Sequence, residues 1–327
     1  MKIVICTDCF PHCAEMLRQY LPVDEVLPCP ASEVRQGTKD ADVIIPAMFR
    51  VDADVIAHTS ACLIHQFGVG LEGVDIPAAT RRGIYVANVP GTGTGNAFSV
   101  AEHTVFLMLA LARRLPRAQE NVQRCLLGSP LGTSLQGKTA GVVGVGSIGK
   151  ELIKRLKGFE MRILGLKRHP AEELRKELGL EFLGGQGDLP FLLRESYFVI
   201  LTLPVTAETR GLIGSQELAS MRRTAFLINV GRGPLIDHEA LVNALAQGQI
   251  AGAGLDVFWD EPTDPDDVLF RYHVIATPHI AGVTDTSYHD IARALAENVN
   301  RIRAGLPPLH CVNLQEVKKV RRQEKKH

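Results

Sequence analysis

Short apolar runs alternate with polar, helix-like stretches along the first third of the chain. The apolar runs cover residues 2–6, 42–47, 63–68 and 84–88, and each one ends near Gly, Pro, Asn or Asp. Runs of this length between turn-forming residues are typical of buried strands. The alternation therefore predicts an α/β unit built on a parallel sheet.

A glycine-rich segment, VPGTGTGN at 89–96, precedes a long helical pattern at 99–115. The spacing Ser99-x-x-Glu102 predicts a capping box that opens this helix. The glycines could hold a phosphate. A hinge is favoured, because no strand runs directly into them and no lysine follows at P-loop spacing.

A second and longer α/β series begins at Gly137. Strands are predicted at 139–146, 161–166, 198–204, 225–231, 252–257 and 274–279, with helices that include 153–156 and 238–246. This regular alternation indicates a doubly wound dinucleotide-binding domain. One amphipathic helix at 286–303 and a short ending follow, and a single helix cannot form a domain.

The predicted fold class is therefore α/β, with two Rossmann-like or flavodoxin-like lobes, doubly wound parallel sheets and a cleft between them. Residues 1–97 together with 286–327 form the expected substrate domain, since the late helix packs back on the first lobe. Residues 98–285 form the expected dinucleotide-binding domain.

Composition favours a small-molecule substrate over nucleic acid or a membrane. The 327 residues are 46% hydrophobic, which is enough for two cores, and 36 basic residues balance 36 acidic ones. A basic tail could be a nucleic-acid arm, but a solvated, frayed terminus is the preferred interpretation. Its residues are Lys318, Lys319, Arg321, Arg322, Lys325 and Lys326.

The lack of a recognisable targeting signal and the cysteine usage predict a soluble, cytoplasmic protein. The first apolar run meets Asp8 at once, and the apolar stretch at 105–112 is too short to cross a bilayer. Seven scattered cysteines suit a reducing compartment. Cys6, Cys9 and Cys13 with His12 have spacing that could suggest a metal site, but no second Cys/His pair follows, so a strand end and its loop are favoured and no metal is predicted.

The sequence GVVGVGSIG places a GxGxxG motif between an apolar strand and a helix, as dinucleotide binding requires. Gly144 permits the tight turn, Gly146 admits a pyrophosphate, and Gly149 allows close packing of helix and strand. The N–H groups of Ser147 and Ile148 point toward the phosphates. A merely tight turn between strand and helix is the structural alternative.

The next strand ends in cations instead of the acidic residue that binds the ribose of NAD. Lys167, Arg168 and His169 occupy this position. A carboxylate would repel a 2′-phosphate, whereas these cations can form charge-assisted hydrogen bonds with it. NADP(H) is therefore favoured, and NAD(H) remains possible if the three residues are simply solvated.

Three later strands are followed by Arg232, Glu261 and His279. Ligands of open α/β sheets bind outside the carboxyl ends of the strands, so these side chains can converge beside a nicotinamide. Each also has an ordinary interpretation, as a helix cap, a surface acid before Pro262 and a loop residue after Pro278. His65 in a strand and His103 in a helix are both expected to be structural.

The chain resembles the D-isomer-specific 2-hydroxyacid dehydrogenases, a family that includes glyoxylate/hydroxypyruvate reductases and phosphoglycerate dehydrogenases. The resemblance runs from about residue 42 to 293. It is carried by GVGLEGVD, ATRRGI, SVAEH, GVVGVGSIG, LTLPVTAETRGLI, NVGRGPLID, AGLDVFWDEP and TPHIAG. It implies hydride transfer between NAD(P)(H) and a small 2-hydroxy or 2-oxo acid, with glyoxylate/hydroxypyruvate-type reduction expected.

The resemblance also implies roles for individual residues. His279 looks like the general acid and base, and Glu261 like the partner that fixes its tautomer and favours its protonated form. Arg232 looks like the anchor of the substrate carboxylate, helped by the N–H groups of Val69 and Gly70. The remaining cofactor contacts implied are Pro204, Val230, Gly231 and, at the nicotinamide amide, Asp256.

Some positions depart from the family pattern or leave the function open. The segment 124–139 matches the family's dimer arm but lacks its usual tryptophan, so a homodimer is expected with an uncertain contribution to the neighbouring site. Tyr197 stands where the family often has Asp. The predicted specificity loop is 46–50, whose Arg50 could meet a second anionic group or solvent, and Trp259 could lie near the cleft.

Two rival functions remain. A phosphite dehydrogenase is the nearest enzymatic alternative, whereas the family's formate dehydrogenases usually carry a glutamine where Glu261 stands. A non-enzymatic, nucleotide-sensing corepressor on the same fold is the alternative from another class. Turnover of 2-oxo acids distinguishes it from an enzyme.

Overall fold

The apolar runs of the sequence form the parallel strands of two separate sheets. The computed structural model describes residues 1–91 and 93–324. They belong to two units, Met1–Asn96 with Thr284–His327 (unit 1) and Ala97–Val283 (unit 2). Thr92 of the glycine-rich segment and Lys325 and Lys326 of the basic tail lie outside the described residues. No helix within those residues has the length and apolar character that a membrane span requires.

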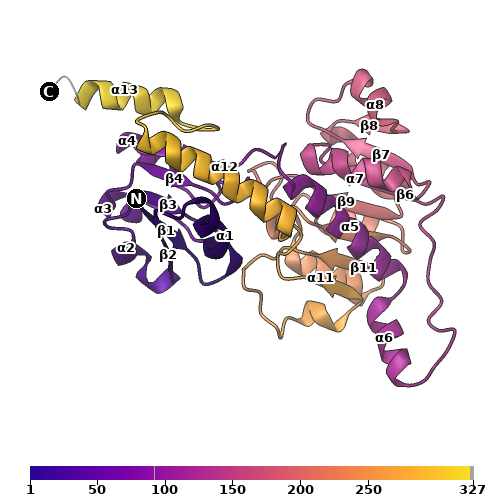
Figure 1. The fold of residues 1–327 in the computed structure, drawn as a ribbon. Helices are drawn as coiled ribbons and strands as arrows, with labels where there is room; N and C mark the ends of the chain where they lie inside the picture. Colours follow the sequence, from indigo (N-terminus) through magenta and orange to yellow (C-terminus); the bar gives the residue numbers. More distant parts are fainter. Residues whose placement is uncertain (92, 325–327) are drawn as a thin grey trace. The chain divides into compact units, whose positions relative to one another are not determined.

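Unit 1 contains a five-stranded parallel sheet in the order β2-β1-β3-β4-β5, which is the flavodoxin-like order (Figure 1). Its core consists of aliphatic side chains from these strands and the helices beside them, with Val4, Ile44 and Ile64 fully or almost fully buried. The strands are β1 (Lys2–Cys6), β2 (Glu25–Cys29), β3 (Val43–Ile45), β4 (Leu63–His65) and β5 (Tyr85–Ala87).

The described residues of unit 1 form six helices. Helix α12 packs against α1, and Tyr288 of α12 contacts both the Cys13 thiol at 3.9 Å and the ring of Phe67. The helices are α1 (His12–Tyr20), α2 (Val34–Gly37), α3 (Ala53–His58), α4 (Ile76–Arg81), α12 (Asp285–Arg303) and α13 (Leu314–Glu324), with one 3₁₀ turn, η1 (Ala31–Glu33).

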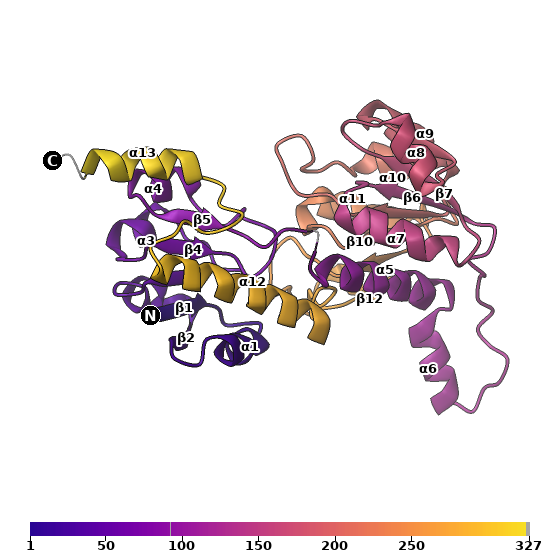
Figure 2. The same ribbon diagram turned by 45° about the horizontal axis from the view of Figure 1, so that its top comes forward.

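The prediction of a frayed basic tail is wrong for its described part, because residues 314–324 form α13. This helix packs on α4 and β5 (Figure 2). Arg321 donates to the carbonyl of Gly83 at 2.9 Å and lies 4.3 Å from the centroid of the Tyr85 ring. A cation on an aromatic face and a satisfied carbonyl stabilise the docked helix, and charge counting alone could not reveal either contact.

Unit 2 contains a seven-stranded parallel sheet in the order β12-β11-β10-β9-β6-β7-β8. The strand order reverses between β6 and β9, so this is the doubly wound arrangement with its switch point beside β6. The strands are β6 (Thr139–Val143), β7 (Arg162–Leu166), β8 (Phe182–Gly184), β9 (Phe198–Leu201), β10 (Phe226–Asn229), β11 (Gly252–Leu255) and β12 (Val274–Ala276).

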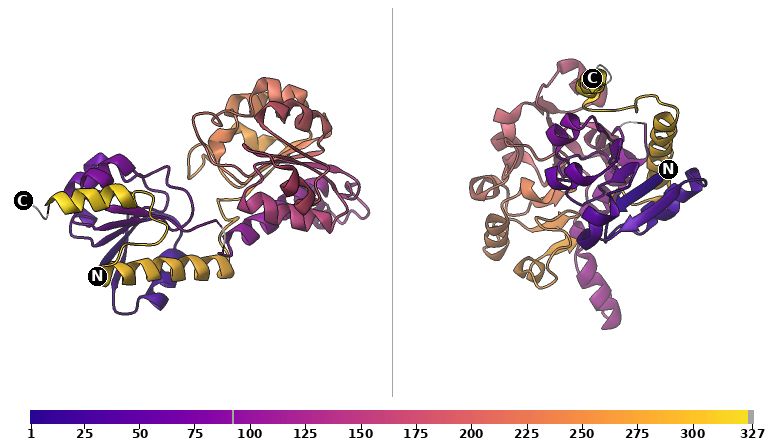
Figure 3. Two further views of the ribbon diagram at one scale, coloured as in Figure 1. Left: turned by 90° about the horizontal axis from the view of Figure 1, so that it is seen from above. Right: turned by 90° about the vertical axis from the view of Figure 1, so that its left-hand side faces the viewer.

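One apolar core covers each face of this sheet, and one of the two cores includes side chains of the long helix α5. Helix α6 projects away from the rest of the unit in Figures 1 and 2 and in the right-hand view of Figure 3. The helices are α5 (Asn96–Ala112), α6 (Leu115–Gln123), α7 (Ser147–Lys157), α8 (Glu172–Leu178), α9 (Leu189–Glu195), α10 (Ser215–Ser220) and α11 (His238–Ala246), with 3₁₀ turns η2 (Gln186–Asp188), η3 (Gly233–Leu235) and η4 (Val268–Arg271).

The predicted capping box is also wrong. Helix α5 begins at Asn96, so Ser99 lies inside its first turn and is buried, and Glu102 pairs with Arg155 of α7 at 2.9 Å. Two strands, β2 and β8, were not predicted. Both lie at an edge of their sheet, and neither shows the continuous apolar run of a central strand. Strand β2 also contains Pro28, which is tolerated in an edge strand.

Candidate active site

The glycine motif forms a tight turn between β6 and α7 at the switch point of the unit 2 sheet. Gly144 has φ of +108°, which favours glycine. A Cβ at Gly149 would lie 2.4 Å from the carbonyl oxygen of Gly144, whereas a Cβ at Gly146 would meet nothing within 4 Å. The turn therefore needs Gly149 for its own packing and leaves open space at Gly146, which suits a pyrophosphate.

Helix α7 begins at Ser147, so the N–H groups of Ser147, Ile148 and Gly149 have no acceptor within the helix. Their partial positive charge and the helix dipole favour an anion at this end. Lys167, directly after β7, donates from Nζ to the carbonyl of Val145 at 3.0 Å. The ammonium therefore lies next to the turn that would hold the nucleotide.

The catalytic candidates follow three neighbouring strands whose ends are aligned. Asn229 of β10 pairs in register with Leu255 of β11, and Leu255 pairs with Ala276 of β12. Arg232, Glu261 and His279 lie in the loops after these strands, so all three begin from one edge of the sheet. Their positions in one unit follow directly from parallel pairing.

His279 and Glu261 form a direct hydrogen bond. The Nδ1 atom of His279 donates to Oε2 of Glu261 at 2.7 Å, and the other carboxylate oxygen accepts from the N–H of Phe258 at 2.9 Å. Burial alone raises the pKa of Glu261. The bond and charge of His279, the Phe258 N–H and the charge of Arg232 outweigh burial, so the pKa of Glu261 is lowered. Glu261 therefore stays ionised at neutral pH, and this stabilising contribution is lost only as the pH falls through that lowered pKa.

Arg232 is held by its own loop. Its carbonyl accepts from Nδ2 of Asn229 at 2.8 Å, and its guanidinium donates to the carbonyl of Gly231 at 2.7 Å. A Cβ on Gly233 would lie 2.0 Å from backbone atoms of Phe258, so the Arg232 loop and the loop toward Glu261 are in contact. This close approach explains how the positive charge of Arg232 acts on Glu261.

The predicted nicotinamide-side residues surround the same strand ends. Val230 is buried, and a Cβ on Gly231 would lie 2.7 Å from the carbonyl oxygen of Leu203. Pro204 is exposed in the loop that follows β9, and its carbonyl accepts from the hydroxyl of Thr209. Arg168 is exposed after β7, and its charge reaches Glu208 in the loop that follows β9.

Asp256 is 1% exposed and is surrounded by donors. Oδ1 accepts from the hydroxyl of Thr277 at 2.7 Å and from the N–H of Ile280 at 2.9 Å, and Oδ2 accepts from the N–H of Ala281 at 2.9 Å. Nε2 of His103 lies 3.5 Å from Oδ1. Asp256 therefore fixes the loop that carries His279, a role that its position in the sequence did not suggest.

In unit 1, the loop after β4 presents two N–H groups. The carbonyls of Gly68 and Val69 accept from the N–H of Val89 and the side chain of Asn88. Among the described residues, the N–H groups of Val69 and Gly70 donate to no acceptor. A loop whose carbonyls are tied back and whose N–H groups remain available suits an anion.

Several polar residues that support these loops were not singled out from the sequence, namely Asn88, Asn229 and Thr277. Asn229 is fully buried at the end of an otherwise apolar strand. A buried polar residue needs hydrogen-bond partners, so a polar position closing an apolar run was the available signal. His65 is structural as predicted. Burial lowers its pKa to about 4, and its ring contacts Asn298 and the carbonyl of Gln66.

The remaining chemistry-bearing residues have structural surroundings. Burial raises the pKa of the Cys6 and Cys13 thiols to about 12, and Cys9 is exposed. Within the described ranges, no group of three or more His, Cys, Asp or Glu side chains is placed to hold a metal ion. Trp259 donates to the carbonyl of Ile236 and contacts the His238 ring. Tyr197 packs against Phe198 and Phe226.

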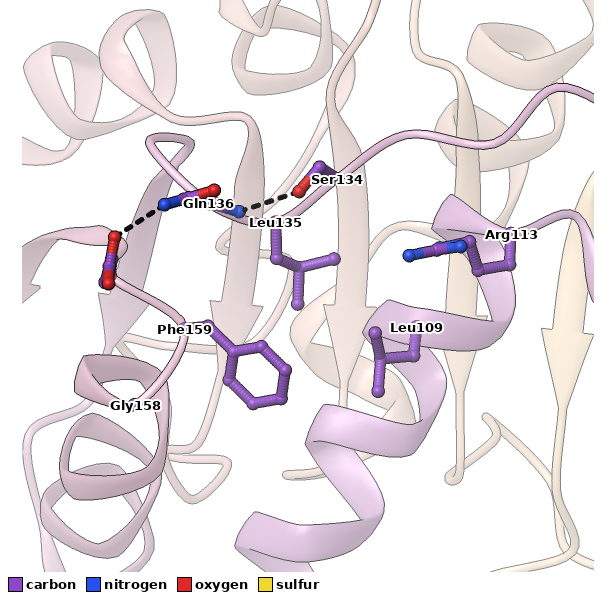
Figure 4. A pocket seen from close by; sticks show the side chains of 8 residues that line it. Leu109, Arg113, Ser134, Leu135, Gln136, Gly158 and Phe159 are labelled. Carbon is purple, nitrogen blue, oxygen red and sulfur yellow. Dashed lines mark hydrogen bonds between the residues drawn. The ribbon is translucent and has the colours of Figure 1, made fainter.

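A pocket of about 230 Å³ lies at the opposite, amino-terminal edge of the unit 2 strands (Figure 4). Leu109, Leu135 and Phe159 form its apolar part, and Gln136 donates to Glu160 at 2.6 Å across one side. None of the predicted site residues lines it. Ligands of open α/β sheets bind at the carboxyl ends of the strands, so this pocket at the amino ends is separate from the candidate active site.

Comparisons with known proteins identify the family. The model of the D-isomer specific 2-hydroxyacid dehydrogenase, NAD binding domain, matches residues 105–281. The chain belongs to the D-isomer specific 2-hydroxyacid dehydrogenase family. It is a nicotinamide-dependent oxidoreductase whose NAD-binding domain lies in unit 2. The resemblance inferred from the sequence motifs is thereby confirmed, as is the α/β fold class.

Individual relatives agree with this family. A glyoxylate reductase of Aeropyrum pernix is 38% identical, covering 98% of each chain. A D-3-phosphoglycerate dehydrogenase of Archaeoglobus fulgidus is 36% identical, covering 87% of this chain but 53% of its own length. The solved NADPH-dependent glyoxylate/hydroxypyruvate reductase of Sinorhizobium meliloti, in complex with NADP and malonate, has a TM-score of 0.82 at 28% identity, covering 95% of this chain and 96% of that one.

The two glycines of the nucleotide turn give a matched test. We expect Gly149→Ala to lower the free energy of unfolding by about 1–3 kcal/mol, because its methyl group collides with the Gly144 carbonyl. Gly146→Ala should cost less than about 1 kcal/mol but weaken binding of the nicotinamide cofactor, since the methyl group enters open space. Urea unfolding and fluorescence titration measure the two effects. Equal destabilisation by both variants would contradict this assignment.

Proposed function

We propose that this chain reduces a small 2-oxo acid of the glyoxylate or hydroxypyruvate type to a D-2-hydroxy acid, with NADPH as the reductant. The observation that carries the proposal is the 2.7 Å bond between His279 and Glu261 beside Arg232, at the aligned ends of β10, β11 and β12. The names of the relatives, glyoxylate reductase above all, support this substrate class.

His279 is the proton donor of this reaction. Its Nδ1–H is engaged by Glu261, so Nε2 is the nitrogen that faces the substrate oxygen. The carboxylate of Glu261 fixes the orientation of the ring, and the Nε2 proton goes to the carbonyl oxygen as the hydroxyl forms. In the direction of oxidation, the same nitrogen accepts the hydroxyl proton.

Arg232 and the unit 1 loop bind the substrate carboxylate. The planar guanidinium of Arg232 can pair with a carboxylate in two places and polarise the adjacent carbonyl. The N–H groups of Val69 and Gly70, which donate to nothing else among the described residues, are suited to the other carboxylate oxygen. In this proposal unit 1 is the substrate domain and unit 2 the dinucleotide-binding domain.

The residues of unit 2 fit a nicotinamide dinucleotide. The open space at Gly146 and the first N–H groups of α7 suit the pyrophosphate, and Val230, Gly231 and Pro204 lie at the strand ends expected for the nicotinamide. Asp256 has three donors, and a carboxylate offers about four acceptor positions, so one remains for the nicotinamide amide. When bound, the cofactor supplies the hydride that reduces the C2 carbonyl.

Lys167 and Arg168 set the preference for NADPH. Lys167 already lies at the nucleotide turn through its bond to the carbonyl of Val145, and Arg168 is exposed beside it. Neither position offers a carboxylate for the ribose hydroxyls, whereas both offer charge-assisted donors to a 2′-phosphate.

A homodimer is the proposed assembly, because the arm beyond α5 exposes apolar side chains. Leu127 and Leu131 are 97% and 92% exposed, and Val122 of α6 is 77% exposed. Three large apolar side chains on a projecting arm are costly in water, and a second copy of the chain would cover them.

The catalytic role of His279 is tested by His279→Ala and His279→Asn. Loss of the proton donor should lower kcat with glyoxylate or hydroxypyruvate by about 10²–10⁴-fold. The affinity for NADPH, measured by fluorescence titration, should change little. A near-normal rate in either variant would refute the mechanism. Tight NADPH binding by the unmodified protein without turnover across a panel of 2-oxo acids would favour a nucleotide sensor instead.

Cofactor preference is tested by Lys167→Asp. The new carboxylate should repel a 2′-phosphate and accept ribose hydroxyls, lowering kcat/KM for NADPH by about 10–100-fold while preserving or raising it for NADH. Lys176→Asp, which makes the same charge change at an exposed site on α8, is the control. A native enzyme with higher kcat/KM for NADH than for NADPH contradicts the proposed preference.

The assembly is tested by Leu127→Ser combined with Leu131→Ser. If these side chains are covered in a dimer, the double variant should shift toward monomer in size-exclusion chromatography with light scattering, because the apolar contact is lost. Val23→Ser, at an apolar side chain that is 83% exposed in unit 1, is the control and should leave the assembly unchanged. A native protein that is monomeric at micromolar concentration rules the dimer out.

A further inference from the structure

The backbone at His279 has an unusual conformation. Its φ is +55°, in the left-handed region that side chains other than glycine enter at a cost. Such a conformation persists only where the surroundings fix it. The proposed proton donor therefore depends on whatever holds residues 277–281 in place.

Asp256 accepts most of the hydrogen bonds that fix this loop. Its backbone carbonyl accepts from the N–H of His279 at 2.9 Å, and its carboxylate accepts from the N–H groups of Ile280 and Ala281, also at 2.9 Å. One residue thus binds three consecutive N–H groups. The loop geometry is correct only if the Asp256 carboxylate is itself correctly oriented.

The direction of the next hydrogen bonds can be worked out from their chemistry. The Thr277 hydroxyl has one proton, and Asp256 Oδ1, 2.7 Å away, can only accept it. The Thr277 oxygen must then accept from Nε2 of His103, which lies 2.8 Å away. This fixes the His103 tautomer with its proton on Nε2, and it forms a chain from His103 through Thr277 to Asp256.

We propose that His103, on α5, is a positioning residue for the reaction, because its Nε2–H orients the Thr277 hydroxyl toward Asp256 and so fixes the loop that presents His279. This role rests on the proposed function of His279 as the proton donor. His103 reaches the loop of His279 through the hydroxyl of Thr277, which lies 2.8 Å from its Nε2.

The surroundings of His103 support a neutral imidazole acting as donor. Its side chain is 14% exposed, and its ring lies 5.4 Å from that of Phe106. Burial lowers the pKa of His103, and the nearby charge of Asp256 opposes this only in part. A neutral ring with its proton on Nε2 is a directional donor.

The test compares His103→Phe with His103→Gln. Phe fills the site but cannot donate, whereas Gln keeps an N–H donor on a flexible side chain. We expect His103→Phe to lower kcat for glyoxylate by about tenfold, as expected for the loss of one hydrogen bond in a charged network, and His103→Gln to recover much of that loss. KM for glyoxylate and the Kd for NADPH should change by less than about threefold.

Thr277→Val and Thr277→Ser test the same chain at its middle member. Valine removes the hydroxyl while keeping the shape, and serine retains it, so kcat should fall in the first variant and recover in the second. His273→Phe is the matched control, since it removes a partly buried imidazole of unit 2 whose described hydrogen bond goes to the carbonyl of Ala251 and not to the 277–281 loop. Its kcat should match that of the unmodified protein.

The outcomes separate this role from the function on which it rests. Unchanged kcat in both His103→Phe and Thr277→Val, with His279→Ala inactive, overturns the positioning role alone. A lower thermal midpoint with normal kcat also overturns it, because packing would then be the whole contribution. Normal turnover by His279→Ala overturns the proposed function itself. If His103→Phe does not fold, the Thr277 pair decides the question.

Discussion

The register of β10, β11 and β12 aligns Asn229, Leu255 and Ala276 in one row. Parallel strands can exchange hydrogen bonds only in fixed steps, so the loops that follow them must start from that row. A slip of one residue in any of the three would turn its alternate side chains to the other face of the sheet. Every distance within the Arg232, Glu261 and His279 group depends on this pairing.

Small residues allow the loops that follow these aligned strands to contact one another. Glycine at 231 and at 233 allows backbone to approach backbone where any Cβ would collide. Carboxylates hold the resulting loops: Glu261 binds the N–H of Phe258 as well as His279, and Asp256 binds the loop of His279. Polar groups that lie near the reaction thus also complete the hydrogen bonding of buried backbone.

The sequence was sufficient to predict the parts of the fold whose signal is local. The central strands are continuous apolar runs, and the glycine turn occurs between a strand and a helix, so periodicity and motif context identified them. Edge strands β2 and β8, the docking of α13 and the true start of α5 were missed. Each of these depends on contacts with residues distant in the chain, such as Arg321 with Tyr85, or Glu102 with Arg155. The role of Asp256 in holding a loop was hidden for the same reason.

The left-handed backbone at His279 also narrows which amino acids can occupy the position. Glycine, asparagine, aspartate and histidine enter this region more readily than other residues, and β-branched side chains are almost excluded. Of these four, only histidine exchanges a proton near neutral pH. Chain geometry and acid–base chemistry therefore select the same amino acid independently, so a substitution that satisfies one requirement does not satisfy the other.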